Sequence, residues 1–311
     1  MRRWSPWVCL AMAAGIVPTA HAADGLVWQW PEGETRRYRL KADLQLHQAM
    51  FLQAEYNKDS RVYDLAYAVD LDCKAVEQGK GFLVTCDIDD AQLTAAGEDP
   101  DNLLPILDEW DGKLTDNASV QLTLTEDGRV KEIDLLGLNE RNQRIRLIKE
   151  TMHALLSRGL SAFDLQLPKK GDDEGESWKQ KSELVMQLPI LVGGVGSSQL
   201  RNEVSGDDGG LPVIDTTGRG SLMIGEQISG PGDTRPPDVF DFTVSARGTF
   251  DPAKGMLVSR AMMVQGTLTP GSGSAMGTVA APYILAADLQ YVAPGTPSTM
   301  LGNNAVRPMK K

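Results

Sequence analysis

The sequence predicts a mainly β protein (a β-rich α+β fold): a curved antiparallel sheet or half-barrel of two related units, with one main amphipathic helix between them. Three observations favour this fold. Long segments alternate apolar and polar residues with period two, as half-buried strands do. Only one clear segment, 139–158, repeats apolar residues at helical spacing. Turn signals such as Asp127-Gly128 separate the alternating segments.

Residues 1–22 have the composition of an export signal. Arg2 and Arg3 give a positive start, an apolar stretch follows, and Ala20-His21-Ala22 fits a cleavage site. We expect the mature chain to begin at Ala23 and to be periplasmic or secreted. No second apolar run of membrane length follows, so we expect no stable membrane insertion.

The first unit, residues 23–160, is predicted to contain strands and then the helix. Apolar residues alternate over 38–46, 63–73, 82–88 and 120–124. In the helix the apolar positions are Ile145, Ile148, Met152, Leu155 and Leu156. Asn139 can cap the helix start, Arg158 suits its last turn, and Gly159 can end it.

Two cysteines of the mature chain, Cys73 and Cys86, are predicted to form a disulfide. A two-residue turn at Gly79-Lys80 has glycine in the first position, as a type II′ turn requires. Counting outward from that turn places Cys73 opposite Cys86 at a non-hydrogen-bonded pair, where a disulfide fits. Both cysteines share a face with apolar neighbours, so we expect the bond to face the core.

The second unit, residues 161–293, returns to strands. Alternation predicts them over 178–188, 240–250, 256–268 and 283–291. Gly193-Gly194-Val195-Gly196 is interpreted as a flexible connection because no phosphate-loop lysine follows it. Residues 294–311 have no periodicity and are predicted to be a disordered tail.

A weak internal repeat favours two related units. Gly33-Glu34 precedes one strand and Gly175-Glu176 precedes another. The chain also resembles a family of uncharacterised secreted bacterial proteins with an "LP…GDSW" and a later "G…FD…G" pattern. The matching residues are Leu167-Pro168, Gly175-Glu176-Ser177-Trp178, Gly248-Thr249-Phe250-Asp251 and Gly255-Met256-Leu257. The resemblance implies a β-rich exported protein and no activity. The order of elements is also similar to the half-barrels of lipoprotein carriers, as an analogy of fold.

Composition narrows the function classes. Without Arg2 and Arg3 the basic residues fall from 31 to 29 against 42 acidic ones, a formal net charge of -13. This charge argues against binding of nucleic acid or anionic membrane surfaces. The mature chain keeps two histidines, His47 and His153, and no hydrolase or metalloprotease motif occurs. We therefore predict a non-catalytic protein.

Four carboxylates are expected on the polar face of the disulfide hairpin. The same register places Asp70 opposite Asp89 and Asp72 opposite Asp87. Like charges directly opposite destabilise a sheet. Calcium could relieve the repulsion, because it prefers hard oxygen ligands. Alternatively the patch is a solvated rim, balanced by Lys74 or by Arg39 and Lys41 of a neighbouring strand.

The predicted function is binding of a hydrophobic ligand or an envelope polypeptide by an exported protein. Flexible methionines lie on the predicted apolar faces, among them Met186 and Met262, which are the candidate ligand contacts. Trp28 and Trp30 are predicted to pack at the edge of the core. The alternative function is a structural or assembly factor of the cell envelope. A closed sandwich of the two sheet halves would leave no cavity.

Overall fold

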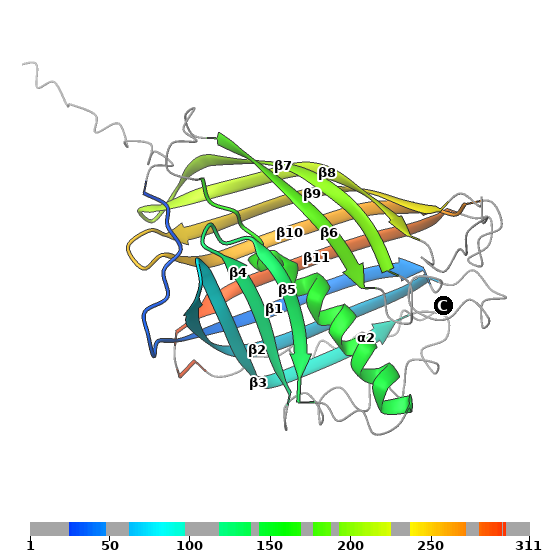
Figure 1. Cartoon of the computed structure of the whole chain (residues 1–311), viewed down its shortest axis with the longest axis horizontal. Coiled ribbons are helices and arrows are strands. Elements are labelled where there is room, and N and C mark those ends of the chain that lie inside the picture. Colours follow the sequence, from blue (N-terminus) through cyan, green and yellow to red (C-terminus); the bar gives the residue numbers. More distant parts are fainter. Residues whose placement is uncertain are drawn as a thin grey trace, which may run out of the picture.

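One curved antiparallel sheet forms the protein. The structure is a computed structural model that describes residues 25–47, 62–96, 118–137, 143–168, 177–187, 193–224, 237–271, 280–293 and 295–296. Eleven strands follow the order β5-β4-β3-β2-β1-β11-β10-β9-β8-β7-β6. The sheet is open and curves around helix α2 (Figure 1). The predicted mainly β, half-barrel architecture is therefore confirmed.

The chain builds the sheet in two halves, separated in sequence by α2 and a short 3₁₀ helix, η4. The first half contains β1 Thr35–His47, β2 Val62–Gln78, β3 Gly81–Ala96, β4 Ser119–Thr125 and β5 Val130–Leu136. α2 spans Gln143–Leu160 and η4 spans Ser161–Phe163. The second half contains β6 Ser177–Gln187, β7 Gly193–Asp208, β8 Leu211–Ile224, β9 Asp238–Asp251, β10 Met256–Thr269 and β11 Ala281–Val292.

The two halves meet at the middle of the sheet, where the first strand pairs with the last. β1 and β11 are antiparallel over a long ladder that runs from Arg37 opposite Val292 to Leu46 opposite Tyr283. The buried apolar residues form one core cluster with members in both halves of the sheet. Residues 23–160 and 161–293 therefore contribute to one sheet and one core. That they are related repeats stays a prediction.

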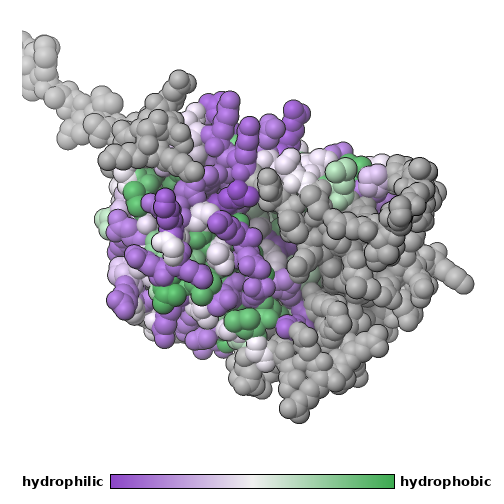
Figure 2. Space-filling model, in the orientation of Figure 1, coloured by the Kyte–Doolittle hydropathy of each residue, from purple (hydrophilic) through white to green (hydrophobic). Residues whose placement is uncertain are grey.

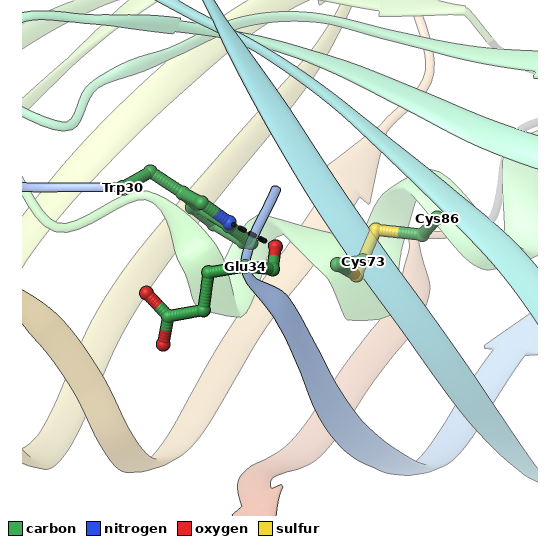
Figure 3. The surroundings of a disulfide bond; sticks show 4 residues. All are labelled: Trp30, Glu34, Cys73 and Cys86. Atoms are coloured by element: carbon green, nitrogen blue, oxygen red, sulfur yellow. Dashed lines mark hydrogen bonds between the residues drawn. A yellow bond between two sulfur atoms is a disulfide. The ribbon is translucent and has the colours of Figure 1, made fainter. Parts of the chain in front are cut away.

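The disulfide hairpin has the predicted register near its turn. Gln78 lies opposite Gly81 and Cys73 opposite Cys86, and Gly79 has φ +65°. Cys73 and Cys86 are bonded, with Cα atoms 3.9 Å apart, and both are fully buried. Figure 3 shows the bond between neighbouring strands, near Trp30 and Glu34. The predicted core-facing disulfide is confirmed; closing so short a loop stabilises the fold by about 3 kcal/mol.

Beyond the disulfide the register shifts, and one predicted pair is wrong. Asp72 lies opposite Asp87 as expected, but Asp70 lies opposite Asp90 instead of Asp89. The shift occurs between Asp70 and Leu71. A β-bulge places an extra residue on one strand, so all pairs beyond it move by one position.

Helix α2 confirms the predicted helix with later bounds. It begins at Gln143 and ends at Leu160, and the predicted cap Asn139 lies outside the described residues. The sequence predicted that Gly159 would end the helix, but the helix continues to Leu160. A Cβ atom at Gly159 would lie 2.4 Å from the Tyr67 hydroxyl oxygen, so glycine at this position allows β2 to approach the last turn closely.

Strands β7 and β8 correct the interpretation of residues 193–196. These residues begin β7, where Gly194 lies opposite both Met186 and Ile224. The segment is therefore part of the sheet and is not a flexible connection. Figure 1 shows β7 and β8 as long strands beside β9.

Several sequence predictions lie outside the described residues. These are the export signal 1–22 and, apart from residues 295–296, the tail 294–311. Within the described residues, no helix has the length and apolar character needed to cross a membrane. The face shown in Figure 2 is mostly hydrophilic, with small hydrophobic patches between polar side chains.

Candidate functional site

The candidate site is the inner face of the sheet, which we define as the face that contacts α2. Tyr38 and Leu40 of β1 are fully buried there, while Lys41 on the opposite face is exposed. The cross-strand register continues this apolar face across the sheet. Its buried members include Leu44, Leu65, Tyr67, Val69, Leu71, Leu222, Phe240, Phe242, Met262, Leu268, Tyr283, Leu285 and Leu289.

Helix α2 packs against the two central strands and one edge strand of the sheet. Its principal contacts are with β1, β5 and β11, and η4 contacts β10 and β11. The Tyr67 hydroxyl donates a hydrogen bond to the Leu155 carbonyl at 2.6 Å. Phe163 of η4 meets Tyr38 edge to face, with ring centroids 4.9 Å apart. These contacts hold the helix against the inner face of the sheet. In the second half, strands β6 to β9 lie beyond the main contacts of α2 and η4.

On the inner face of β8 to β10, the aromatic rings of β9 lie against glycines of the two neighbouring strands. Phe240 and Phe242 are stacked, with centroids 5.3 Å apart. A Cβ atom at Gly220 would lie 2.2 Å from the Phe242 ring, and one at Gly266 would lie 2.5 Å from the Phe240 ring. Glycine therefore allows both rings to lie against the neighbouring strands, which makes this surface smooth and apolar.

Asp164 connects the two edge strands of the sheet. Its Oδ1 accepts a hydrogen bond from the Val130 backbone N–H of β5 at 3.0 Å. Its Oδ2 accepts one from Gln180 Nε2 of β6 at 3.1 Å. The Leu167 N–H also donates to the Asp127 carbonyl of the β4–β5 turn at 2.7 Å. The segment after α2 therefore fills the seam between the edges.

A polar network fixes that segment to the inner face. Arg260 donates to the Asp164 carbonyl at 2.6 Å and to Thr216 Oγ1 at 3.2 Å. Thr216 donates to Asn202 at 2.7 Å, and Asn202 to Gln180 at 3.2 Å. Burial lowers the pKa of Arg260 to about 10, against the attraction of Asp164. Desolvation raises the pKa of half-buried Asp164. The network closes on itself, which indicates a structural role.

Arg158, in the last turn of α2, is buried in a different environment. The residue is 7% exposed, and among the described residues its Nε, Nη1 and Nη2 atoms have no hydrogen-bond partner. Its guanidinium lies 5.9 Å from the centroid of the Tyr283 ring. A cation is favourable at a helix C-terminus, but a buried charge without a partner is costly. The sequence placed Arg158 in the last turn and did not predict its burial.

The buried tyrosines of the inner face lead to a prediction for alkaline solution. Burial raises the pKa values of Tyr38, Tyr67 and Tyr283 above the ordinary value of 10.0. Above pH 10 the unfolded chain releases these protons while the folded protein keeps them, so stability must fall as the pH rises. Each tyrosine contributes about 1.4 kcal/mol per pH unit. Denaturant unfolding at several alkaline pH values measures the slope. Tyr67→Phe should make the slope shallower, and an unchanged slope would contradict the prediction.

Two arginines of β1 bind the predicted carboxylate patch. Arg39 makes a two-pronged contact with fully buried Asp70, with Nε–Oδ1 and Nη2–Oδ2 distances of 2.7 and 2.8 Å. This hydrogen bonding raises the pKa of Arg39. Arg37 lies 3.4 Å from Asp70 and 3.5 Å from Asp72, and it also forms an ion pair with Asp89. The expected balance by Arg39 is present, whereas the role of Arg37 was not predicted.

The arginines remove the reason for a calcium ion at the patch. Asp87, the fourth predicted ligand, is exposed opposite Asp72. In the part of the chain that the structure describes, no three His, Cys, Asp or Glu side chains are grouped as a metal site. Calcium binding by Asp70, Asp72, Asp87 and Asp89 stays a prediction that this geometry does not favour.

The other sequence-predicted residues are placed as follows. Met262 is buried on the inner face, and its sulfur lies 3.9 Å from the Ser161 hydroxyl oxygen. The Met186 backbone belongs to β6, but its side chain lies outside the described residues. Trp28 and Trp30 are buried, which confirms their predicted packing. Met262 therefore lies on the predicted apolar face, and contact of Met186 or Met262 with a ligand stays a prediction.

A groove of about 760 Å³ lies on the outer face of β7 to β10. Hydroxyl and amide side chains such as Ser197, Thr243 and Gln265 line it, together with Arg219 and Asp241. These side chains alternate with the apolar residues of the inner face. Phe242 and the glycines Gly220 and Gly266 also line the groove. Because the groove lies on the outer face, it is separate from the apolar interior to which the sequence-based prediction of a ligand refers.

Comparisons with known proteins leave the family open. No protein-family model matches the chain, and no curated protein matches it. The predicted resemblance to a family of uncharacterised secreted proteins is therefore unconfirmed. Among solved structures the chain is similar to one titled "Lipid-protein interactions in lipovitellin", at 9% identity and a TM-score of 0.45. The match covers 88% of this chain and 27% of that lipovitellin chain, so this chain spans about a quarter of its length.

Proposed function

We propose that this protein binds a lipid-like apolar molecule in the interior of its curved sheet. The observation that carries the proposal is the apolar inner face, which continues onto β9 and β10 beyond the strands that α2 mainly contacts. Phe240, Phe242 and Met262 extend this face beyond the strands that α2 mainly contacts. Flat rings and a flexible thioether suit ligands of variable shape. No step of this function requires catalysis.

The proposed place of action is the periplasm or the extracellular space. The Cys73–Cys86 disulfide supports it, because such bonds persist in oxidising compartments. An apolar molecule released into water there would need a carrier that shields it. The acidic surface charge favours a freely diffusing carrier over one held to anionic lipid.

A neutral fluorescent hydrocarbon such as diphenylhexatriene tests the proposal. We expect saturable binding by the native protein and strong loss of binding in Met262→Asp, which puts a charge on the inner face. Met263→Asp is the matched control, because Met263 is the neighbouring residue on the outer face and is 41% exposed. Circular dichroism must show that both variants are folded. Absence of saturable binding by the native protein would overturn the proposal.

Assembly with an envelope polypeptide is the alternative function. β5 and β6 are the edge strands of the ladder, and an edge strand can pair with a further chain. Native mass spectrometry of protein recovered from its host separates the two functions. A retained small apolar molecule supports the proposal, whereas a stoichiometric protein partner supports the assembly function.

A further inference from the structure

We propose that Arg158 binds the anionic head group, a carboxylate or a phosphate, of an amphiphilic ligand. This inference rests on the proposed function and specifies the chemistry of the ligand. The apolar part of the ligand would lie on the inner face of the sheet, and its head would reach the end of α2.

The contacts of the other buried arginines set Arg158 apart. Four arginines are buried in the part of the chain that the structure describes. Arg36 binds Glu34 and the Lys254 carbonyl, Arg39 binds Asp70, and Arg260 binds Asp164 and Thr216. Of these four arginines, only Arg158 has no hydrogen-bond acceptor for any of its three side-chain nitrogens. An oxyanion is the group that a guanidinium pairs with best.

The surroundings of Arg158 connect it to the apolar surface. Its guanidinium lies over the Tyr283 ring, which meets Phe240 edge to face at 5.2 Å. Phe240 in turn stacks on Phe242. The positive charge also acts on the hydroxyl groups of Tyr67 and Tyr283, opposing the rise of their pKa values. A head group at Arg158 would therefore be flanked by aromatic rings that lead along the inner face of β9.

The same argument makes a prediction for the protein without ligand. A buried guanidinium without an acceptor destabilises the fold, and an apolar residue of similar length removes that cost. Arg158→Met should therefore raise the denaturation midpoint while it weakens anion binding. A residue that merely supports the fold would show the reverse effect on stability. Arg158→Gln is a second variant that keeps polarity and removes the charge.

The experiment compares three probes of equal chain length: a fatty acid, an alkyl phosphate and the neutral fatty alcohol. Calorimetric titration of the native protein should show tighter binding of at least one anion than of the alcohol. Arg158→Met and Arg158→Gln should weaken that anion on the order of tenfold to hundredfold, as loss of a charged hydrogen bond implies. Their affinity for the alcohol should not change. Arg219→Met removes an exposed charge from the outer face and should leave all three affinities unchanged.

The outcomes separate this inference from the function on which it rests. The anion that loses more affinity in Arg158→Met identifies the head group as carboxylate or phosphate. If all three probes bind the native protein and Arg158→Met equally, the head-group inference is wrong and the proposed function stands. If none of the probes, the alcohol included, binds the native protein, both are wrong.

Discussion

Arg260→Met is expected to lower the free energy of unfolding by about 3–5 kcal/mol, because it removes one member of a buried charged network. Arg260 is 2% exposed and holds both the segment after α2 and Thr216. Without it, the Asp164 carboxylate that connects β5 to β6 loses the stronger of two nearby positive charges, those of Arg260 and Arg129. Urea unfolding at pH 7 measures the loss.

The pH dependence of the same variant gives a second readout. The pKa of Asp164 is already raised above 3.8 by desolvation, and removing Arg260 must raise it further. Above pH 3.8 the unfolded chain releases the proton while the folded protein retains it, so stability falls as the pH rises. The variant should extend this fall to higher pH. Arg247→Met is the control: its side chain is 66% exposed, and its loss should cost about 0–1 kcal/mol. Equal effects of the two substitutions would contradict the prediction.

Asp70→Asn is expected to cost about 3 kcal/mol or more, because Arg39 would keep its charge and lose the buried carboxylate that neutralises it. The substitution preserves the shape of the side chain, so the loss reports on charge and hydrogen bonding. Asp72→Asn is the matched control on the same strand. The Asp72 side chain is 36% exposed and 3.5 Å from Arg37, so its loss should cost about 0–1 kcal/mol.

The comparison of the two aspartates is made by denaturant unfolding at neutral pH. A similar small loss in both variants would show that the Arg39–Asp70 contact adds little to stability. Repeating the measurements with calcium also examines the carboxylate patch. A calcium-dependent rise in the midpoint of the native protein, lost in Asp72→Asn, would restore the metal interpretation.

Strands could be predicted wherever one face is uniformly apolar. In β1, the apolar residues alternate with polar ones without interruption, at positions Tyr38, Leu40, Ala42 and Leu44. The hairpin at Gly79-Lys80 was equally readable, because a two-residue turn fixes the register. The register beyond the shift at Asp70 could not be predicted, because neither the sequence pattern nor the turn geometry indicates one extra residue.

Strands β7 and β8 were not predicted, because some of their inward-facing side chains are polar. Ser198, Asn202 and Thr216 are buried on the inner face, so the alternation of apolar with polar residues disappears from the sequence. Asn202 and Thr216 are satisfied by the network around Arg260, whose members come from distant strands. The alternation of apolar and polar residues depends only on neighbours in the sequence, so it does not predict this network.

The candidate site was predicted only in part for a related reason. An apolar face with methionines was readable, and Met262 lies there. The burial of Arg158 could not be predicted, because an arginine in the last turn of a helix is ordinarily solvated and favourable there. Its position depends on the packing of α2 against β11, which joins segments far apart in the chain.

The central pairing of β1 with β11 has a consequence for how the chain acquires its structure. Thr35–His47 and Ala281–Val292 lie near opposite ends of the sequence, so their ladder closes a very long loop. Chain entropy opposes such closure, and domains rich in non-local strand pairs fold slowly. The hairpins of each half can form early, but the middle of the sheet must wait for the last strand. Until then both β1 and β10 expose a strand edge, and we expect the half-formed sheet to be the species most prone to aggregation.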